Sequence, residues 1–280
     1  MRELELIVSS AEDGLSAGEL LKGRGFSRRV VVALKASGGL TRNGEILRTV
    51  DRVRAGELVR AALFEEGGLV PNPDVCASVA YEDEDAVVFQ KPPFVAVHPS
   101  IKHYGDTLGN LFAAMYGDIP FRPINRLDRN TSGLCLCAKN KLAAGLLSGC
   151  AEKTYFAVVD GEIAQDGRID APIERESESI IKRCVRPDGK PAVTLYEPIS
   201  YSRGRTLLRV TLLTGRTHQI RVHFAHIGYP LCGDDMYGGD CSVINRHALH
   251  CGELRFVSPA SGETITVKSE LPEDMRRLLD

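Results

Sequence analysis

The residues best suited to chemistry stand near the middle of the chain, where Asp128 lies between Arg126 and Arg129 and the small polar residues 130–133 follow. Arginines beside a carboxylate can keep it ionised and can hold an anionic partner next to it. The same segment is also typical of a turn, because short polar side chains bond to nearby backbone groups. The pattern therefore allows either a catalytic carboxylate beside a phosphate or a structural turn.

Strands are predicted over residues 153–159 and 205–213, where apolar and polar side chains alternate. The first of these places Tyr155 on the face opposite Phe156. A tyrosine on such a strand is ordinarily half buried with its hydroxyl in water. A flat ring is also suited to stacking on a nucleobase, which contributes about 1 to 3 kcal/mol. Both interpretations remain open for Tyr155.

A helix is predicted over residues 218–226, directly after the second strand. Thr214 or Thr217 can cap its amino end. His218 and Arg221 lie three residues apart and therefore share one face of the predicted helix.

Three segments closely resemble, in the same order, motifs of the RluA-type pseudouridine synthases, enzymes that isomerise uridine to pseudouridine within RNA: residues 125–133, 153–159 and 214–223. The resemblance implies that Asp128 is the catalytic carboxylate, that Tyr155 stacks on the target base and that Arg221 pairs with Asp128 and keeps it ionised. Weaker matches at residues 83–93, with 98–99 beyond them, and at residues 228–234 and 247–250 frame the same domain.

The implied reaction converts one isomer into another, so no cofactor is expected. Asp128 would either attack the ribose or the base, or remove a ribose proton, and both routes stay open. A base inside a stack cannot reach a pocket, so the target must be flipped out or already unpaired. Arg126 is the candidate for the vacated space or the neighbouring phosphate, and Arg129 is a further RNA-binding candidate. The family often has histidine where this chain has Asn125.

Histidine and cysteine spacing predicts no metal site. The three histidines of the predicted helix lack the glutamate of a metalloprotease helix, and the eight cysteines form no Cys-x-x-Cys pair. For His98, His247 and His250 we expect structural hydrogen bonds. Free thiols in a chain without a signal peptide predict a cytoplasmic location, and no apolar run is long enough for a membrane span.

A small module is predicted near the amino end. Ser16 and Glu19 form a capping box for a first helix. Ser27 can start a second helix that ends at Gly38, and residues 43–44 predict a hairpin turn. This order of two helices and a hairpin resembles the αL-type RNA-binding domain that many members of the family carry at the amino end.

Charge supports RNA binding by this module. Residues 21–54 contain nine basic and two acidic residues, whereas the whole chain has a net charge of −2 and a pI near 6.4. An RNA-binding surface must therefore be concentrated in patches, although a charged run is commonly just a solvated face. The candidate RNA-binding residues of the module are Arg24, Arg28, Arg29, Lys35 and Arg42.

We therefore predict an α+β protein. A helix-helix-hairpin RNA-binding domain over residues 1–66 and a linker over residues 67–77 precede a catalytic domain over residues 78–280, which resembles the mixed, mostly antiparallel sheet of pseudouridine synthases. The predicted function is site-specific isomerisation of uridine by a monomer, with ribosomal RNA favoured over transfer RNA. Two alternatives are an RNA-binding protein of the same fold without catalysis, and an aspartyl phosphohydrolase, which would need a second carboxylate for magnesium.

Overall fold

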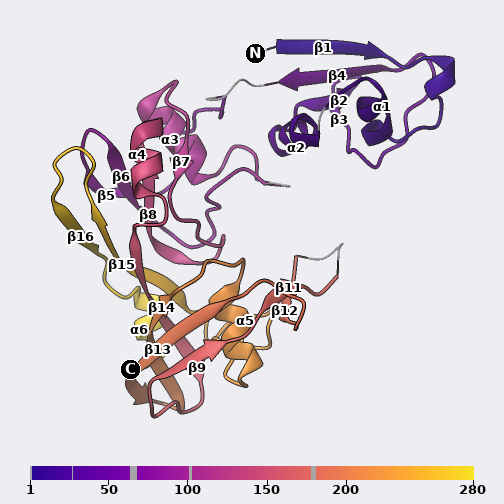
Figure 1. Ribbon diagram of the computed structural model, residues 1–280. Coiled ribbons are helices and arrows are strands. Elements are labelled where there is room, and N and C mark those ends of the chain that lie inside the picture. Colours follow the sequence, from indigo (N-terminus) through magenta and orange to yellow (C-terminus); the bar gives the residue numbers. More distant parts are fainter. Residues whose placement is uncertain (1, 27, 64–67, 101–102, 178–180) are drawn as a thin grey trace. The chain divides into compact units, whose positions relative to one another are not determined.

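The computed structural model describes residues 2–26, 28–63, 68–100, 103–177 and 181–280. These residues form two compact units, the first made of Met1–Val75 and Ala96–Phe121 and the second of Cys76–Val95 and Arg122–Asp280 (Figure 1). The sequence prediction puts residues 96–121 in the catalytic domain instead, and its boundary at residues 66 and 67 lies outside the described residues. The domain boundaries therefore stay predictions.

The first unit contains a sheet with the strand order β1-β4-β2-β3. Its described elements, in chain order, are β1 (Arg2–Ile7), the short 3-10 helix η1 (Ser10–Glu12), α1 (Ala17–Gly23), α2 (Arg28–Ser37), β2 (Leu40–Arg42), β3 (Glu45–Ile46), β4 (Leu58–Leu63) and α3 (Leu108–Tyr116). The predicted two helices and hairpin are present. The pairing of β1 with β4 was not predicted from the sequence.

Local sequence explains the elements that were predicted. The Ser16 side chain accepts a hydrogen bond from the backbone N–H of Glu19, and the Glu19 carboxylate accepts one from the backbone N–H of Ser16, which completes the capping box at α1. Asn43 and Gly44 have φ angles of 53° and 87° and form the tight turn between β2 and β3. Ser27, the predicted start of the second helix, lies outside the described residues.

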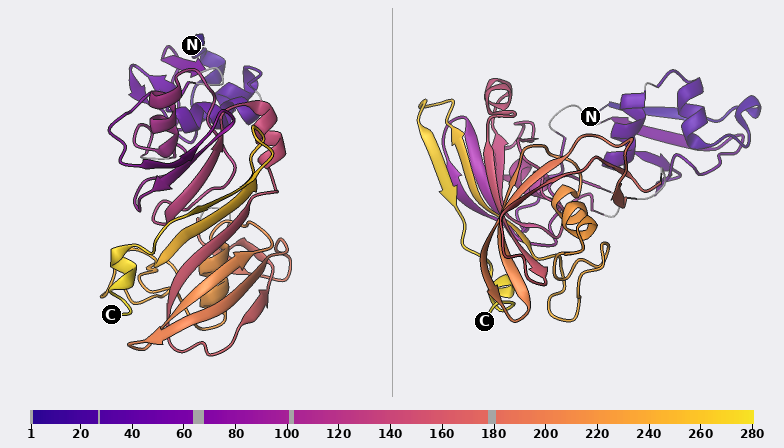
Figure 2. Two further views of the ribbon diagram at one scale, coloured as in Figure 1. Left: turned by 90° about the vertical axis from the view of Figure 1, so that its left-hand side faces the viewer. Right: turned by 60° about the horizontal axis from the view of Figure 1, so that its bottom comes forward.

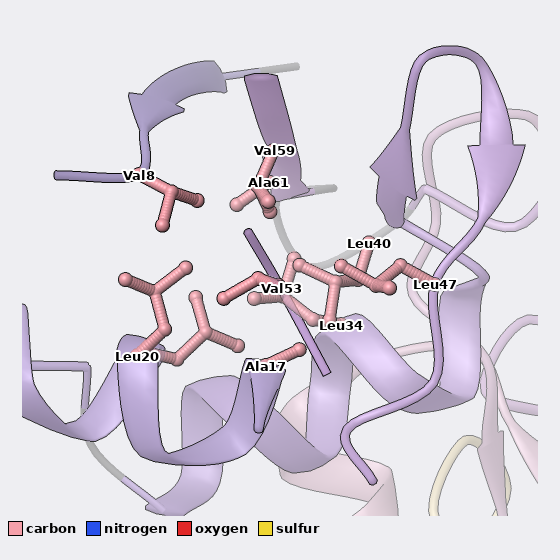
Figure 3. Packing of buried hydrophobic residues seen from close by; sticks show 10 residues of the cluster. Val8, Ala17, Leu20, Leu34, Leu40, Leu47, Val53, Val59 and Ala61 are labelled. Atoms are coloured by element: carbon pink, nitrogen blue, oxygen red, sulfur yellow. The ribbon is translucent and has the colours of Figure 1, made fainter. Parts of the chain in front are cut away.

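One hydrophobic core holds α1, α2, β2 and β4 together (Figure 3). Leu20 of α1 and Leu34 of α2 are each 1% exposed, and they pack in the same cluster as Val59 and Ala61 of β4. Val30, as predicted, faces this core from α2 and is partly buried there. The apolar stripes of two short helices are thus covered by β4, which is why the helices are stable at this length.

The second unit is built on a larger sheet with the strand order β10-β13-β14-β9-β15-β8-β6-β5, to which β16 adds beside β15 and β7 beside β8 (Figures 1 and 2). Its described elements are β5 (Ser78–Glu82), β6 (Ala86–Lys91), β7 (Arg122–Pro123), β8 (Ser132–Ala138), α4 (Lys141–Leu147), β9 (Glu152–Asp160), β10 (Gly167–Asp170), β11 (Ile173–Arg175), β12 (Arg183–Val185), β13 (Val193–Ser202), β14 (Arg205–Leu212), α5 (Gln219–His226), β15 (Leu249–Val257), β16 (Thr264–Lys268) and α6 (Glu273–Arg276).

The sheet is mixed and mostly antiparallel, as predicted. β15 pairs with β8 in parallel and with β9 and β16 in antiparallel fashion. Every residue of β8 is buried, and beyond Ser132 and Gly133 the strand is apolar rather than amphipathic, as is typical of a strand covered on both faces. The predicted strands at residues 153–159 and 205–213 correspond to β9 and β14, which pair with each other.

The predicted threonine cap of α5 is wrong. His218 occupies the N-cap position in the left-handed region, with φ 58°, and its side chain makes no capping hydrogen bond. The loop before the helix is held instead by Gln219, whose Oε1 accepts hydrogen bonds from the Thr214 hydroxyl and from the Arg216 backbone. A residue of the helix that bonds back to the preceding loop therefore replaces the predicted threonine cap.

Candidate active site

Asp128 and Arg221 meet at one pocket. Asp128 lies in the turn before β8, its backbone oxygen accepts a hydrogen bond from Thr131 N at 3.1 Å, and its side chain is 27% exposed. Arg221 Nη1 of α5 donates to Asp128 Oδ2 at 3.2 Å, while the Arg221 side chain is only 5% exposed. The structure thus brings together the two residues that the resemblance pairs, and it leaves one face of the carboxylate open to a ligand.

A second carboxylate, which the sequence prediction missed, fixes Arg221. The Nε and Nη2 atoms of Arg221 donate to the two oxygens of Asp234 at 2.7 and 2.8 Å, and the Asp234 side chain is 0% exposed. Burial lowers the pKa of Arg221, but the hydrogen bonds and charges of Asp234 and Asp128 outweigh burial and leave this pKa above its ordinary value. One planar guanidinium therefore bridges a buried and a partly exposed carboxylate.

The imidazole of His218 lies on the same side of Asp128. His218 Nε2 is 3.8 Å from Asp128 Oδ2, and His218 Nδ1 is 2.9 Å from the Tyr237 hydroxyl. The Tyr237 oxygen also accepts the backbone N–H of Arg183 at 3.0 Å, which favours donation of its own proton to His218 Nδ1. The hydrogen of the imidazole then lies on Nε2, facing the carboxylate.

Burial sets the protonation state of both rings. It lowers the pKa of His218 below its ordinary value, so the imidazole is neutral at neutral pH, and it raises the pKa of Tyr237 to about 12. Tyr237 also places its ring centroid 5.0 Å from the Arg221 guanidinium carbon, a cation–π contact. Tyr237, which no motif in the sequence signalled, therefore orients two of the groups that face Asp128.

Within 4.0 Å of the Asp128 carboxylate, the described part of the chain places Arg221 and His218. The expectation that the flanking arginines hold the carboxylate is therefore corrected. Arg126 is exposed and lines the pocket, and Arg129 is exposed. The cation that pairs with the carboxylate therefore comes from α5, far away in the sequence, and not from the residues beside Asp128.

The pocket has an empty volume of about 360 Å³ and is lined by Asp128, Arg221, His218 and Tyr155 among others. Charged groups lie around Asp128, whereas Tyr155 contributes an aromatic wall. A pocket of this kind can hold one flat ring beside a carboxylate.

Tyr155 is more deeply placed than an ordinary strand tyrosine. It is 6% exposed and lies opposite Cys251 of β15, whose thiol contacts its hydroxyl. Burial raises the pKa of the Tyr155 hydroxyl well above its ordinary value, so the group keeps its proton. The interpretation with the hydroxyl in water is wrong, and Tyr155 is one of the residues that line the pocket at Asp128.

Substitutions at Tyr155 should separate the ring from the hydroxyl. Tyr155→Phe keeps the ring, whereas Tyr155→Leu loses it and with it about 1 to 3 kcal/mol of stacking on a bound base. We expect the rate of pseudouridine formation to fall much further in the leucine variant, measured as kcat/KM on one RNA substrate. Equal and severe losses in both variants would assign the function to the hydroxyl instead.

Buried polar contacts fasten the turn that carries Asp128. Thr131 Oγ1 lies 2.8 Å from His247 Nε2, and Ser132 Oγ lies 2.9 Å from His250 Nδ1. Lys91, which is 0% exposed, donates to the Arg129 carbonyl at 3.2 Å, and burial lowers its pKa to about 7. The prediction of structural hydrogen bonds for the two histidines is confirmed.

Asn125 bonds the backbone of the next strand. Its Nδ2 donates to Leu134 O at 3.0 Å, and its Oδ1 accepts from Leu136 N at 2.7 Å. The side chain is 6% exposed. At the position where the family often has histidine, this chain therefore has a residue that joins the catalytic turn to β8. His98 lies in the first unit, where its ring is 5.1 Å from that of Phe121.

The buried histidines make stability depend on pH. Burial lowers the pKa of His250 to about 4 and that of His247 to about 2, against about 6.5 in the unfolded chain. Between the folded and unfolded pKa values, the unfolded chain binds more protons than the folded chain. The contribution of the two neutral histidines to stability is therefore complete above pH 6.5 and is lost as the pH falls. We expect the free energy of unfolding to drop by about 2 kcal/mol per histidine between pH 7 and pH 5, measured by urea denaturation. In His250→Gln, the difference in the free energy of unfolding between pH 7 and pH 5 should be smaller than in wild type. An unchanged difference would show that His250 does not cause it.

The predicted RNA-binding residues of the first unit fall into two groups. Arg24 donates to both oxygens of Glu12 at 2.7 and 2.8 Å, and Arg42 Nη1 lies 3.4 Å from Glu57. These two arginines already have anionic partners within the chain. Arg28 and Lys35 are exposed on α2, and they are the better candidates for phosphate contact. The side chain of Arg29 lies outside the described residues.

Other features bear on cofactors and location. In the described residues, no group of three or more histidine, cysteine, aspartate or glutamate side chains is placed to hold a metal ion. Across the same residues, no helix is both long and apolar enough to cross a membrane. The eight cysteines are free thiols.

Comparison with known proteins identifies the class. The family model for RNA pseudouridylate synthase matches residues 85–226. An uncharacterized RNA pseudouridine synthase of Bacillus subtilis, YjbO, is 39% identical over 277 residues, which cover 94% of this chain and 96% of that protein. The ribosomal large subunit pseudouridine synthase D of Pseudomonas aeruginosa is 39% identical over 266 residues, covering 86% of this chain and 83% of that protein.

A solved structure agrees with these relatives. The human RNA Pseudouridylate Synthase Domain Containing 1 superposes with a TM-score of 0.60 at 27% identity, over 74% of this chain and 87% of that one. The chain therefore belongs to the RNA pseudouridylate synthase family. It is an RNA pseudouridine synthase of the RluA type, an isomerase that converts uridine to pseudouridine in RNA. The phosphohydrolase alternative is thereby excluded.

Proposed function

We propose that Asp128 is the catalytic carboxylate and that large-subunit ribosomal RNA is the substrate. The observation that carries the first part is the 3.2 Å contact between Arg221 and Asp128 at a pocket whose wall includes Tyr155. The second part is supported by relatives named ribosomal large subunit pseudouridine synthase D, which are 35 to 39% identical to this chain.

The reaction assigns a task to each group. The glycosidic bond from C1′ to N1 of uracil breaks, a bond from C1′ to C5 forms, C5 loses a proton and N1 takes one up. Asp128 either attacks the substrate or removes a ribose proton, and its open face is available for both. Arg221 holds the carboxylate in place, and the Tyr155 ring stacks on the uracil while the detached base turns over.

The target uridine must leave its stack to enter this pocket. We propose that Arg126 contacts the neighbouring phosphate or occupies the vacated space, which is supported by its exposure and its place in the pocket lining. Arg129, exposed one residue beyond Asp128, is a further candidate for backbone contact. We propose that the protein acts as a monomer. We also propose a cytoplasmic location, because free cysteines are typical of proteins in that reducing compartment.

The exposed face of α2 is proposed to bind RNA phosphates through Arg28 and Lys35. The double variant Arg28→Gln Lys35→Gln should lower the salt dependence of RNA affinity by about one counterion per residue, roughly two in all. The slope of log affinity against log salt measures this. Arg48→Gln is the matched control, because Arg48 already pairs with Asp51 at 3.0 Å. A slope equal to that of wild type in the double variant would mean that this face is only solvated.

Mapping pseudouridine in ribosomal and transfer RNA from cells with and without this protein tests the substrate. We expect one or more large-subunit positions to remain uridine in its absence, and to be restored by the wild-type gene but not by Asp128→Asn. Loss confined to transfer RNA would overturn the ribosomal assignment while leaving the enzyme class intact.

A further inference from the structure

A second pocket lies beside the candidate active site and is lined by positive charge. Its empty volume is about 510 Å³, and its lining residues include Arg183, Lys190 and Arg216, with Glu174 as an acidic member. We call this the cationic pocket, defined by these four residues. Arg216 also lines the pocket that contains Asp128, so the two pockets adjoin at this side chain.

The backbone of the cationic pocket is fixed at Lys190. Ile173 N donates to Lys190 O at 2.9 Å, and Lys190 N donates to Ile173 O at 3.0 Å. A Cβ atom at Gly189 would lie 2.7 Å from the backbone carbon of Ile173, so only glycine allows the turn to approach β11 this closely. The side chain of Lys190 is exposed at the end of this turn.

The Arg216 side of the pocket is equally constrained. Gln219 accepts the backbone N–H of Arg216 at 2.9 Å and donates to Val193 O at 3.0 Å. Arg216 Nε donates to Pro191 O at 3.0 Å. The guanidinium is thereby held beside the residue that follows Lys190, and its two terminal nitrogens can serve a ligand.

Arg183 has a donor that the protein does not satisfy. Its Nε is buried and has no hydrogen-bond partner among the described residues, and its Nη1 is 4.0 Å from Glu174 Oε1, a loose ion pair. The Arg183 backbone N–H bonds to Tyr237, which in turn contacts His218 of the candidate active site. A guanidinium with one unsatisfied N–H, in a pocket that two further cations line, is suited to an anion with several acceptor oxygens.

We propose that the cationic pocket binds a backbone phosphate of the RNA strand that carries the target uridine. The inference rests on the proposed function, because Arg216 lines both the cationic pocket and the pocket at Asp128 that would receive the flipped base. Three cations against one carboxylate leave a net positive charge among the residues that define the pocket. Contacts of this kind fix the position of the strand and carry no sequence information.

Two charge variants with opposite expected effects test the proposal. Lys190→Gln removes a cation, and it should weaken RNA affinity about fivefold and lower the salt slope by about one. Glu174→Gln removes the acidic member at nearly constant shape, and it should strengthen affinity by a similar factor. A loss of local structure would weaken binding in both variants. The probes are polyadenylate, which contains no uridine, and an unmodified transcript of large-subunit ribosomal RNA.

Lys268→Gln is the matched control, because Lys268 is 74% exposed and pairs with Glu253 outside both pockets. The proposal is overturned if Lys190→Gln and Glu174→Gln both bind polyadenylate as the control does, or if both bind it more weakly. Failure of the proposed function is a different result, namely that no pseudouridine forms in the ribosomal transcript. The polyadenylate measurement does not depend on turnover, so each idea can fail alone.

Discussion

Arg221→Met is expected to destabilise the second unit by about 3 to 5 kcal/mol and to remove most of its activity. Asp234, which is 0% exposed, would lose both of its charge-assisted hydrogen bonds, and Asp128 would lose its contact at 3.2 Å. A buried carboxylate without its counter-charge accounts for the loss of stability. Urea denaturation measures the stability, and pseudouridine formation on a ribosomal transcript measures the activity.

A double variant distinguishes the effect on folding from the effect on catalysis. Arg221→Met Asp234→Leu replaces both members of the buried ion pair with apolar side chains, a change that is often neutral or stabilising. We expect it to recover most of the stability lost in Arg221→Met while activity stays low, because Asp128 still lacks its partner. Recovery of activity together with stability would show that Arg221 acts through folding alone.

Asp128→Asn is expected to reduce turnover by at least about a thousandfold, because an amide can neither attack the substrate nor accept its proton. The side chain keeps its size and is 27% exposed, so the fold should be unaffected. RNA affinity should stay within about tenfold of wild type, roughly 1.4 kcal/mol, measured by equilibrium binding to the ribosomal transcript. Asp235→Asn changes an exposed carboxylate nearby in the same unit and is the matched control.

Local sequence predicted the elements whose formation depends on local chemistry. The capping box at Ser16 and the turn at Asn43 and Gly44 are determined by a few adjacent residues. β9 and β14 were recognisable from their alternation. The pairing of β1 with β4 joins segments more than fifty residues apart along the chain, and no local pattern specifies a partner at that distance.

The candidate site could be predicted only in part, because its residues also come from segments that are far apart in the sequence. The resemblance supplied the pairing of Asp128 with Arg221, which are separated by 93 residues. Charge pattern alone pointed to the adjacent Arg126 and Arg129, and these do not contact the carboxylate in the structure. Asp234 stood within a weakly matched segment, so its role could have been suspected there. Tyr237 acts through contacts from a loop that only the folded chain reveals.

Release of tritium from RNA labelled at uracil C5 is the most direct test of Asp128 as the catalytic carboxylate, since C5 loses its hydrogen only when the new glycosidic bond forms. Wild type and Asp128→Asn are compared on the same ribosomal transcript at saturating RNA concentration. We predict release by wild type and by Asp235→Asn, and none above background by Asp128→Asn. Release by Asp128→Asn within about tenfold of the wild-type rate, about 1.4 kcal/mol in the barrier, would contradict the assignment.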